Sequence, residues 1–353
     1  VLMVGCGRRV RSDAGAEFGM VGVWGLSYGC SLTLISEETL LAFQPQDAVY
    51  KLSARYRFSE LILSPISTGR VTMRFEGIYT PIITPFQNTG AIDWDNYARV
   101  IEWQIENGVS GVIVGGSTGE FYALSKEERI EQFKFANEII NGRVEFMGGV
   151  NALRVEECLE ITSAAKDAGA QSLLVAAPPY SLPSETELAH HVLKIADASG
   201  LPIMLYNYPG RTGVDMAEDF LTLVSKNPLI SAIKESSGDY SRIPLLVNNY
   251  PDIELIVGGE EQVLEFSTWG AKAWVCASAN FFPQECVKFM DVVGRQSDMV
   301  LGQKIMSALM PMMKEIEQGG KFLQCIKLGC EQQGRPGGMV RAPLLPMDDK
   351  LRQ

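Results

Sequence analysis

The feature that most constrains the fold is a regular alternation, from Arg74 onward, of short apolar segments and amphipathic segments of helical length. Eight apolar segments are rich in β-branched residues and nearly continuous in hydrophobic side chains, which is typical of strands covered on both faces. They span residues 78–83, 111–115, 145–150, 172–177, 203–208, 230–235, 253–258 and 273–277. Between them, Ser125 and Ser184 each precede a Glu by three residues, and this capping-box spacing predicts a helix start.

Eight strand–helix units within residues 73–297 match the size of a (β/α)8 TIM barrel. An open, doubly wound sheet also alternates, but no G-x-G-x-x-G motif follows the first apolar segment. We therefore predict an α/β fold, a (β/α)8 TIM barrel over residues 73–297, with extra C-terminal helices over residues 298–353 packed on it. One of these helices carries four methionines, which we expect to fill gaps in the core rather than to bind a ligand. They are Met306, Met310, Met312 and Met313.

Residues 1–72 lack this alternation. A basic segment around Arg8 precedes an apolar, Gly-rich run over residues 18–35, which is the order found in a signal peptide. Acidic residues interrupt the basic part, however, and no small-residue cleavage site follows the run. The run is also marginal in length for a membrane span and is diluted by Gly and Ser. We expect an atypical N-terminal extension outside the folded domain, with Met73 the natural start of the folded unit.

Composition excludes several classes of function. The net charge of −11, without any Lys/Arg-rich block, argues against nucleic acid as a partner. The seven cysteines are odd in number and contain no C-x-x-C pair, which argues against a disulfide framework and favours a reducing, cytoplasmic location. The two histidines, His190 and His191, are adjacent, so they face different sides of a helix and cannot jointly ligate one metal. We predict no metal site and no membrane partner.

In a TIM barrel the chemistry occurs where the strands end at the carboxyl face. The second predicted strand ends in the sequence GGSTGE at residues 115–120, which offers the hydroxyls of Ser117 and Thr118 and several free N–H groups. Such a turn can hold a carboxylate, although a tight structural turn between strand and helix explains the same residues.

Two further strand ends carry groups suited to acid–base chemistry. Tyr180 follows the fourth predicted strand, directly after two prolines that fix the backbone. Tyr206 and Arg211 lie close together at the end of the fifth. An aromatic hydroxyl beside an arginine indicates proton transfer next to the recognition of a carboxylate.

Lys234 lies within the sixth predicted strand, where an ammonium group is costly unless it has a partner or a function. A lysine must be neutral to attack a carbonyl group, and lowering its pKa from about 10.4 to about 7 requires roughly 4–5 kcal/mol of destabilisation of the charged form. A dry barrel interior can supply this energy. The alternative is a lysine that extends to solvent or pairs with a carboxylate such as that of Glu235.

The segment from Met73 to about residue 345 resembles the dihydrodipicolinate synthase/N-acetylneuraminate lyase family of class I pyruvate aldolases. The resemblance covers the whole predicted barrel and its C-terminal helices. It rests on the order and spacing of GGSTGE at 115–120, PPY at 178–180, YNYPGRTG at 206–213, IKES at 233–236, Gly258-Gly259, and Gly337-Gly338 leading to Arg341-Ala342-Pro343.

The resemblance implies a role for each candidate. Lys234 would be the nucleophile that forms a Schiff base with a 2-oxo acid. Tyr206 would shuttle protons as general acid and base, and Thr118 would relay them between Tyr206 and Tyr180. Tyr180 would reach across a tight dimer interface into the neighbouring site. Ser117 and Thr118 would hold the carboxylate of pyruvate.

The resemblance also completes the substrate site with Arg211, Gly259 and Val275. It implies no metal and no organic cofactor, because the protonated imine is itself the electron sink. The partners would be small molecules, pyruvate or another 2-oxo acid plus an aldehyde. The expected assembly is a homodimer or homotetramer.

The particular reaction is less constrained. Arg211 before Thr212-Gly213 is similar to the synthase branch, where this arginine binds the carboxylate of aspartate semialdehyde. We therefore predict 4-hydroxy-tetrahydrodipicolinate synthase-like condensation. The alternative is an aldolase, dehydratase or deaminase acting on N-acetylneuraminate or a 2-keto-3-deoxy sugar acid, because Ser117 replaces the usual threonine of synthases. A second alternative is a non-catalytic barrel used as a binding module. Lys126 and Arg129 replace the histidines of bacterial lysine feedback, so we expect no inhibition by lysine.

Overall fold

The computed structural model describes residues 74–348 and Arg352, and, within the first 73 residues, four short strands. The chain divides into two compact units, Val1–Arg70 and Val71–Gln353. In the first unit, β3 (Glu17–Val23) pairs antiparallel with β1 (Gly5–Cys6), β2 (Val10–Arg11) and β4 (Ser31–Ile35). The predicted extension over residues 1–72 otherwise lies outside the described residues.

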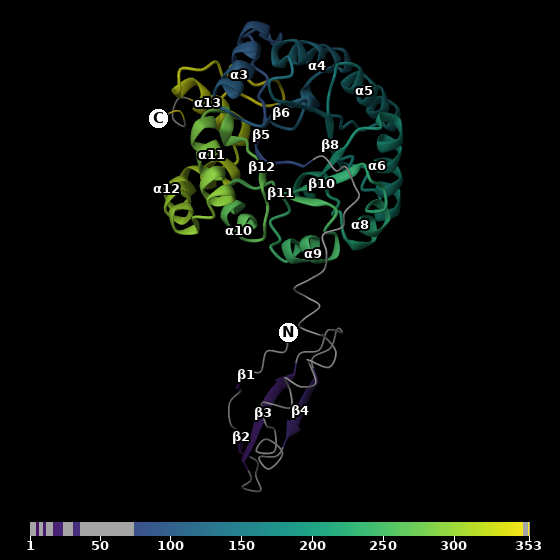
Figure 1. The fold of residues 1–353 in the computed structure, drawn as a ribbon, viewed down its shortest axis with the longest axis vertical. Coiled ribbons are helices and arrows are strands. Elements are labelled where there is room, and N and C mark those ends of the chain that lie inside the picture. The colour runs from purple at the N-terminus through teal and green to yellow at the C-terminus, as the bar shows by residue number, and fades with distance from the viewer. Residues whose placement is uncertain are drawn as a thin grey trace. The chain divides into compact units, whose positions relative to one another are not determined.

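In the second unit, eight parallel strands close into a barrel (Figure 1). Each strand pairs with the next along the chain, and the last strand pairs with the first to complete the closure. The predicted (β/α)8 TIM barrel is therefore confirmed. The strands are β5 (Gly77–Pro81), β6 (Gly111–Val114), β7 (Glu145–Gly149), β8 (Ser172–Ala176), β9 (Ile203–Asn207), β10 (Ile230–Glu235), β11 (Glu254–Val257) and β12 (Ala273–Val275).

Only one predicted strand range, 230–235, has the observed bounds. The other predicted ranges differ by one or two residues at their ends, mostly because apolar and glycine residues continue into the loops. Gly115 is an example, since its φ of 73° belongs to the left-handed region and ends the strand. A Cβ there would also lie 3.2 Å from the backbone oxygen of Gly149, so the turn at the start of GGSTGE requires glycine.

Helices cover the outside of the barrel and surround it in Figure 1. Ser125 and Ser184 form the predicted capping boxes with Glu128 and Glu187. The helices that follow the strands are α3 (Trp94–Glu106), α4 (Lys126–Ile140), α5 (Val155–Asp167), α6 (Glu185–Ser199), α7 (Pro209–Thr212), α8 (Glu218–Val224), α9 (Arg242–Asn249), α10 (Val263–Thr268) and α11 (Pro283–Met290).

Two extra helices follow the barrel, as predicted: α12 (Met299–Gln318) and α13 (Phe322–Gln332). Met306 and Met313 are buried on α12 and pack in the core shared by the barrel strands and helices, which confirms their interpretation as core residues. Among the residues that the structure describes, no helix is both long and apolar enough to cross a membrane.

The inside of the barrel forms its own core, separate from the layer between strands and helices. Because side chains alternate along each strand, every second residue points inward. Near the amino ends of the strands, the Tyr79 hydroxyl donates to the Glu145 carboxylate at 2.7 Å, and Ser172 donates to the same group at 2.7 Å. Gly111 leaves room for the Tyr79 ring, since a Cβ there would lie 2.7 Å from it. Side chains therefore fill the barrel interior at the amino ends of the strands, and a substrate has room only at the carboxyl ends.

A protein that begins at Met73 is expected to fold as the full chain does, because the unit from Val71 contains the complete closed barrel and its core. Thermal unfolding of the two proteins, followed by circular dichroism, should give melting temperatures within about 2 °C of each other. A shortened protein that is insoluble or melts much lower would contradict this expectation.

Candidate functional site

A cavity of about 240 Å³ lies at the carboxyl end of the barrel strands. Seven of the eight residues predicted from the sequence line it. These are Ser117, Thr118, Tyr206, Arg211, Lys234, Gly259 and Val275. They come from five strands or the loops that follow them, so the barrel closure brings together residues that are far apart along the chain.

Lys234 lies on β10 with its side chain inside the barrel, where only 7% of the residue is exposed. The strand register pairs it with Tyr206 of β9, and its Nζ lies 4.0 Å from the centre of the Tyr206 ring. Burial lowers the pKa of Lys234 from 10.5 to about 8, although the charges of Glu317 and Glu260 oppose the shift. This is a destabilisation of the ammonium form by roughly 3 kcal/mol, and it leaves about a tenth of the lysine neutral at pH 7.

The alternative in which Lys234 pairs with Glu235 is wrong. Successive residues of a strand point to opposite faces, so Glu235 points out of the barrel. There the Nε of Arg242 donates to the Glu235 carboxylate at 2.6 Å, and the side-chain amide of Asn207 donates to it at 3.1 Å. The acid next to Lys234 in sequence is therefore occupied elsewhere, and no carboxylate of the described residues is in hydrogen-bond contact with the lysine.

Tyr206 and Thr118 are the buried hydroxyls of the cavity, with 8% and 5% of each residue exposed. Burial raises the pKa of Tyr206, while a hydrogen bond with the Ser117 side chain opposes the shift. The Tyr206 ring also lies 6.0 Å from the ring of Tyr208, measured between centres. A protonated phenol between a lysine and a serine hydroxyl can pass a proton in either direction.

A buried ion pair supports the loop that carries Ser117 and Thr118. The loop ends at Glu120, whose φ of 58° is left-handed and whose side chain is fully buried. Lys327 of α13 lies 2.6 Å from the Glu120 carboxylate and also donates to the backbone oxygen of Thr84 at 2.8 Å. A C-terminal helix thus fixes the turn that forms one wall of the cavity.

Arg211 lies on the short helix α7 at the rim of the cavity. Its guanidinium is 5.4 Å from the ring centre of Tyr208 and 5.6 Å from that of Phe322, so two aromatic rings hold it. In the part of the chain that the structure describes, no carboxylate forms an ion pair with it. The arginine is therefore positioned to bind an anion that enters the cavity.

Tyr180 is the predicted site residue that the structure does not bring to the cavity. It is 95% exposed and its φ of 74° holds the loop after β8 in a left-handed conformation. Leu153 and Leu182, on the loops after β7 and β8, are also large exposed apolar residues. The functional position predicted for Tyr180 requires a second copy of the chain.

Sequence reasoning missed the acidic side of the cavity, formed by Glu260, Glu261 and Glu317. Glu260 is fully buried, and its carboxylate accepts from the backbone N–H groups of Ala277 at 2.6 Å and Ser278 at 3.3 Å. Glu260 and Glu261 come just after the end of a predicted strand, so their position in the sequence could have identified them as cavity residues. Glu317 lies on α12, and no signal in the sequence places that helix beside the strand ends.

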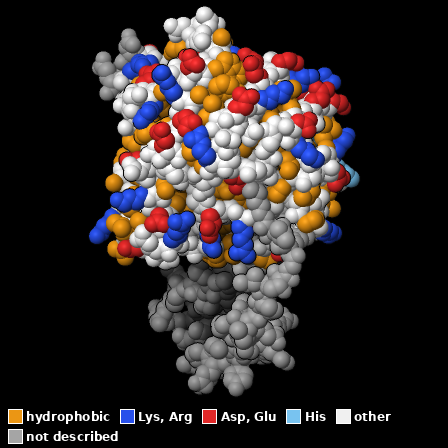
Figure 2. Space-filling model, turned by 45° about the horizontal axis from the view of Figure 1, so that its top comes forward, with side chains coloured by type: hydrophobic (Ala, Val, Ile, Leu, Met, Phe, Trp, Pro, Cys, Tyr) orange, Lys and Arg blue, Asp and Glu red, His pale blue; other side chains and the backbone are white. Residues whose placement is uncertain are grey.

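Two other observations bear on binding partners. Among the described residues, no three His, Cys, Asp or Glu side chains are grouped to hold a metal ion. On the face drawn in Figure 2, basic and acidic side chains are interspersed rather than gathered in one basic patch.

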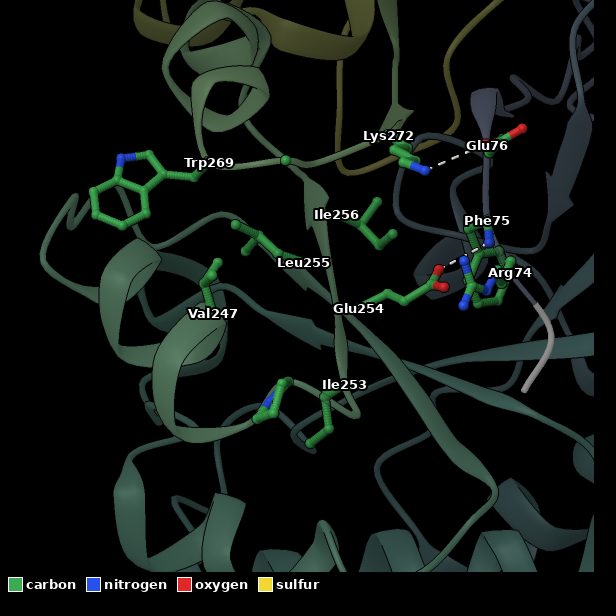
Figure 3. A pocket seen from close by; sticks show the side chains of 12 residues that line it. Arg74, Phe75, Glu76, Val247, Ile253, Glu254, Leu255, Ile256, Trp269 and Lys272 are labelled. Carbon is green, nitrogen blue, oxygen red and sulfur yellow. Dashed lines mark hydrogen bonds and ion pairs between the residues drawn. The ribbon is translucent and has the colours of Figure 1, made fainter. Parts of the chain in front are cut away.

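A second hollow of about 260 Å³ lies at the opposite, amino end of the strands (Figure 3). Three of its charged side chains already have partners: the Glu254 carboxylate accepts from the backbone N–H of Phe75 at 2.9 Å, and Lys272 pairs with Glu76 at 3.9 Å. Figure 3 shows Glu254 turned towards Phe75 on one side of the hollow and Trp269 on the other. This hollow therefore belongs to the closure of the barrel end.

The closed barrel and the lysine-bearing cavity at its carboxyl end define a (β/α)8-barrel enzyme. The model of the dihydrodipicolinate synthetase family matches residues 74–353. The 4-hydroxy-tetrahydrodipicolinate synthase of Methanocaldococcus jannaschii is 33% identical over 284 residues, which are 79% of this chain and 96% of that protein.

Solved structures agree with this match. The 4-hydroxy-tetrahydrodipicolinate synthase of Methylacidiphilum fumariolicum SolV is 32% identical with a TM-score of 0.74, and the match covers 78% of this chain and 92% of that one. The chloride-inhibited dihydrodipicolinate synthase of Acinetobacter baumannii, solved with pyruvate, is 29% identical with a TM-score of 0.75, over 79% of this chain and 96% of that one. The chain belongs to the dihydrodipicolinate synthetase family, a family of lyases, and the resemblance predicted from its motifs is confirmed.

Replacing Lys327 with Met leaves the Glu120 carboxylate buried without its cation. The free energy of unfolding is expected to fall by about 3–5 kcal/mol, because an uncompensated buried charge is strongly destabilising. Urea titration measures this loss. The double variant Lys327→Met/Glu120→Gln removes the charge as well and should regain part of the stability. A loss below about 1 kcal/mol in the single variant would contradict the structural role of the pair.

Proposed function

We propose that the chain is a 4-hydroxy-tetrahydrodipicolinate synthase, which condenses pyruvate with aspartate semialdehyde through a Schiff base on Lys234. The observation that carries the proposal is the burial of Lys234 beside Tyr206 at the carboxyl end of the barrel, with a lowered pKa. The names of relatives at about one-third identity support the same reaction.

In the proposed reaction, the neutral Nζ of Lys234 attacks the 2-oxo carbon of pyruvate, and the carbonyl oxygen leaves as water. The resulting protonated imine withdraws electrons, so the methyl group of pyruvate can lose a proton to give an enamine. The enamine carbon then attacks the aldehyde and forms the new C–C bond. The amino group of the second substrate attacks the imine carbon, closes the ring and releases Lys234 as a free amine.

Tyr206 is the proposed acid and base for these steps. Its protonated phenol can donate to the oxygen that leaves as water and later accept a proton from the pyruvate methyl group. The N–H groups and hydroxyls of Ser117 and Thr118 are proposed to hold the pyruvate carboxylate, with Gly259 and Val275 completing the wall around the substrate.

We further propose a homodimer or homotetramer in which Tyr180 of a second copy extends the proton relay from Thr118. The support for this assembly is the 95% exposure of Tyr180 in a single chain, together with the exposure of two leucines, Leu153 and Leu182, in the loops after β7 and β8. An apolar surface of this kind is unfavourable in water and favours contact with another subunit.

The location and the regulation of the protein are part of the proposal. The cysteines that the structure describes are all free thiols, which supports a cytoplasmic location. We expect no feedback by lysine, because Lys126 pairs with Glu160 at 2.5 Å and Arg129 donates to the backbone oxygen of Asn151 at 2.7 Å. Both cations are therefore occupied at the place where the resemblance puts an effector site.

Incubation with pyruvate and borohydride should add one reduced pyruvyl group to the chain, located at Lys234 by peptide mass spectrometry. Lys234→Met should abolish the adduct while the melting temperature is kept, because methionine fills the buried space without a charge. The initial rate of trapping should rise about tenfold per pH unit up to about pH 8, since only the neutral amine attacks.

The exposed Lys166→Met variant is the control and should trap pyruvate as the unchanged protein does. Absence of any adduct in the unchanged protein would overturn the enzyme proposal and favour a non-catalytic binding module.

Arg211→Ala should raise the KM for aspartate semialdehyde by about tenfold to a hundredfold, because it removes a charge-assisted bond to the substrate carboxylate. Pyruvate trapping at Lys234 should remain. Steady-state kinetics with each substrate varied in turn distinguishes the two effects, and Arg211→Lys should recover only part of the loss.

If the unchanged protein condenses pyruvate only with sugar-derived aldehydes, the synthase proposal fails. The alternative of an aldolase for N-acetylneuraminate or a 2-keto-3-deoxy sugar acid would then hold.

A further inference from the structure

Glu317 is a charged residue that the reaction steps proposed above leave unused. It is the penultimate residue of α12, outside the eight strand–helix units, yet it lines the same cavity as Lys234 and Arg211. The side chain is half-buried. Removing part of a charged carboxylate from water costs free energy, and a function at the cavity would explain why this acid is placed there.

Neither Glu317 nor Arg211 neutralises the other. Within the described residues, the Glu317 carboxylate has no hydrogen-bond or ion-pair partner, and Arg211 is held by the rings of Tyr208 and Phe322 rather than by an acid. Phe322 is the first residue of α13, which follows α12 after a short turn. The segment that joins the two helices therefore brings both Glu317 and the ring that contacts Arg211 to the cavity. Within the described residues, the cavity therefore offers a cation and an anion, Arg211 and Glu317, that have no ion-pair partner.

We propose that Glu317 is a specificity-determining residue that binds the ammonium group of the second substrate while Arg211 binds its carboxylate. The site would then select an amino-acid aldehyde over an aldehyde without the amino group. This inference rests on the proposed synthase function and assigns to α12 the part of the site that distinguishes the second substrate.

The other acids of the cavity are less suited to this task. Glu260 already accepts two backbone N–H groups, and one carboxylate oxygen of Glu261 is buried without a hydrogen-bond partner. Both add negative potential at the same wall, which favours a cationic group on the substrate. Within the described residues Glu261 is half-buried and unpartnered as well, but Glu317 is the acid on which the charges of both Lys234 and Arg211 act, and its half-buried carboxylate is open to a substrate.

The protonation of Glu317 gives the selection a pH dependence. Burial, together with the charges of Glu260 and Glu261, raises the pKa of Glu317 to about 7, although the charges of Lys234 and Arg211 oppose the shift. The phenol of Tyr206 also feels this charge. The carboxylate is thus mostly ionised at about pH 7.5 and mostly protonated at about pH 6, so binding of an ammonium group should weaken as the pH falls.

The test compares aspartate semialdehyde with succinic semialdehyde, which has the same carboxylate and aldehyde but no amino group. The measured quantity is the ratio of the two kcat/KM values at saturating pyruvate, compared between each variant and the unchanged protein. Activation of pyruvate on Lys234 is common to both aldehydes, whereas Lys234 is released by ring closure with aspartate semialdehyde and by hydrolysis of the imine with succinic semialdehyde. That difference is present in every variant and cancels in the comparison. Glu317→Gln should lower this ratio by about tenfold or more at pH 7.5, since it removes a charged hydrogen-bond acceptor. Glu315→Gln, an exposed acid two residues earlier on α12, is the matched control and should leave the ratio as it is.

Borohydride trapping of pyruvate shows that the Glu317→Gln variant folds and forms the Schiff base. If that variant does not fold, the pH profile of the unchanged protein decides: its ratio should fall severalfold from pH 7.5 to pH 6. A flat profile, or a ratio within about twofold in a folded Glu317→Gln variant, would overturn the inference while condensation with aspartate semialdehyde keeps the synthase function. An unchanged protein that traps pyruvate but does not accept aspartate semialdehyde would overturn both.

Discussion

The burial of one amine is the constraint on which the site depends. Lys234 can act as a nucleophile only if its charged form is destabilised, and a closed barrel filled with side chains from below supplies the low dielectric that does this. The same closure sets the neighbours of the lysine. It pairs Lys234 with Tyr206 across two adjacent strands and turns Glu235 to the outer face, where Arg242 neutralises it. Because side chains alternate between the two faces of a strand, Lys234 points into the barrel and Glu235, the acid next to it in sequence, points out.

The helices beyond the barrel also contribute to the site, although most of the residues that line it come from the strands and the segments that follow them. Lys327 of α13 neutralises Glu120 under the loop that carries Thr118, and Phe322 of the same helix supports the arginine at the rim. Glu317 of α12 adds a negative charge at the cavity. The strands thus carry the buried lysine and tyrosine, whereas the C-terminal helices support the loop of Thr118 and the side chain of Arg211.

The fold was predictable from residue patterns because strands covered on both faces are nearly continuous in apolar residues and recur at even intervals. The ends of the strands were less predictable, since apolar residues such as Ala177 continue past the last ladder hydrogen bond into the loop. The cavity residues at strand ends were also predictable, because a barrel places its strand ends on one face. The partner of Lys234 was not, since it depends on which face of the strand a residue takes, and Tyr180, predicted as a site residue, lies outside the cavity of the single chain.

The sequence by itself determined that this chain forms a (β/α)8 barrel with a lysine in its sixth strand and hydroxyl groups at neighbouring strand ends. These conclusions follow from local patterns and from the order of motifs along the chain. Only the tertiary structure decided that no carboxylate among the described residues contacts Lys234 and that Glu317 reaches the same cavity as Arg211. The physical reason is that burial and charge pairing depend on distances between residues far apart in sequence, which packing sets and no local pattern records.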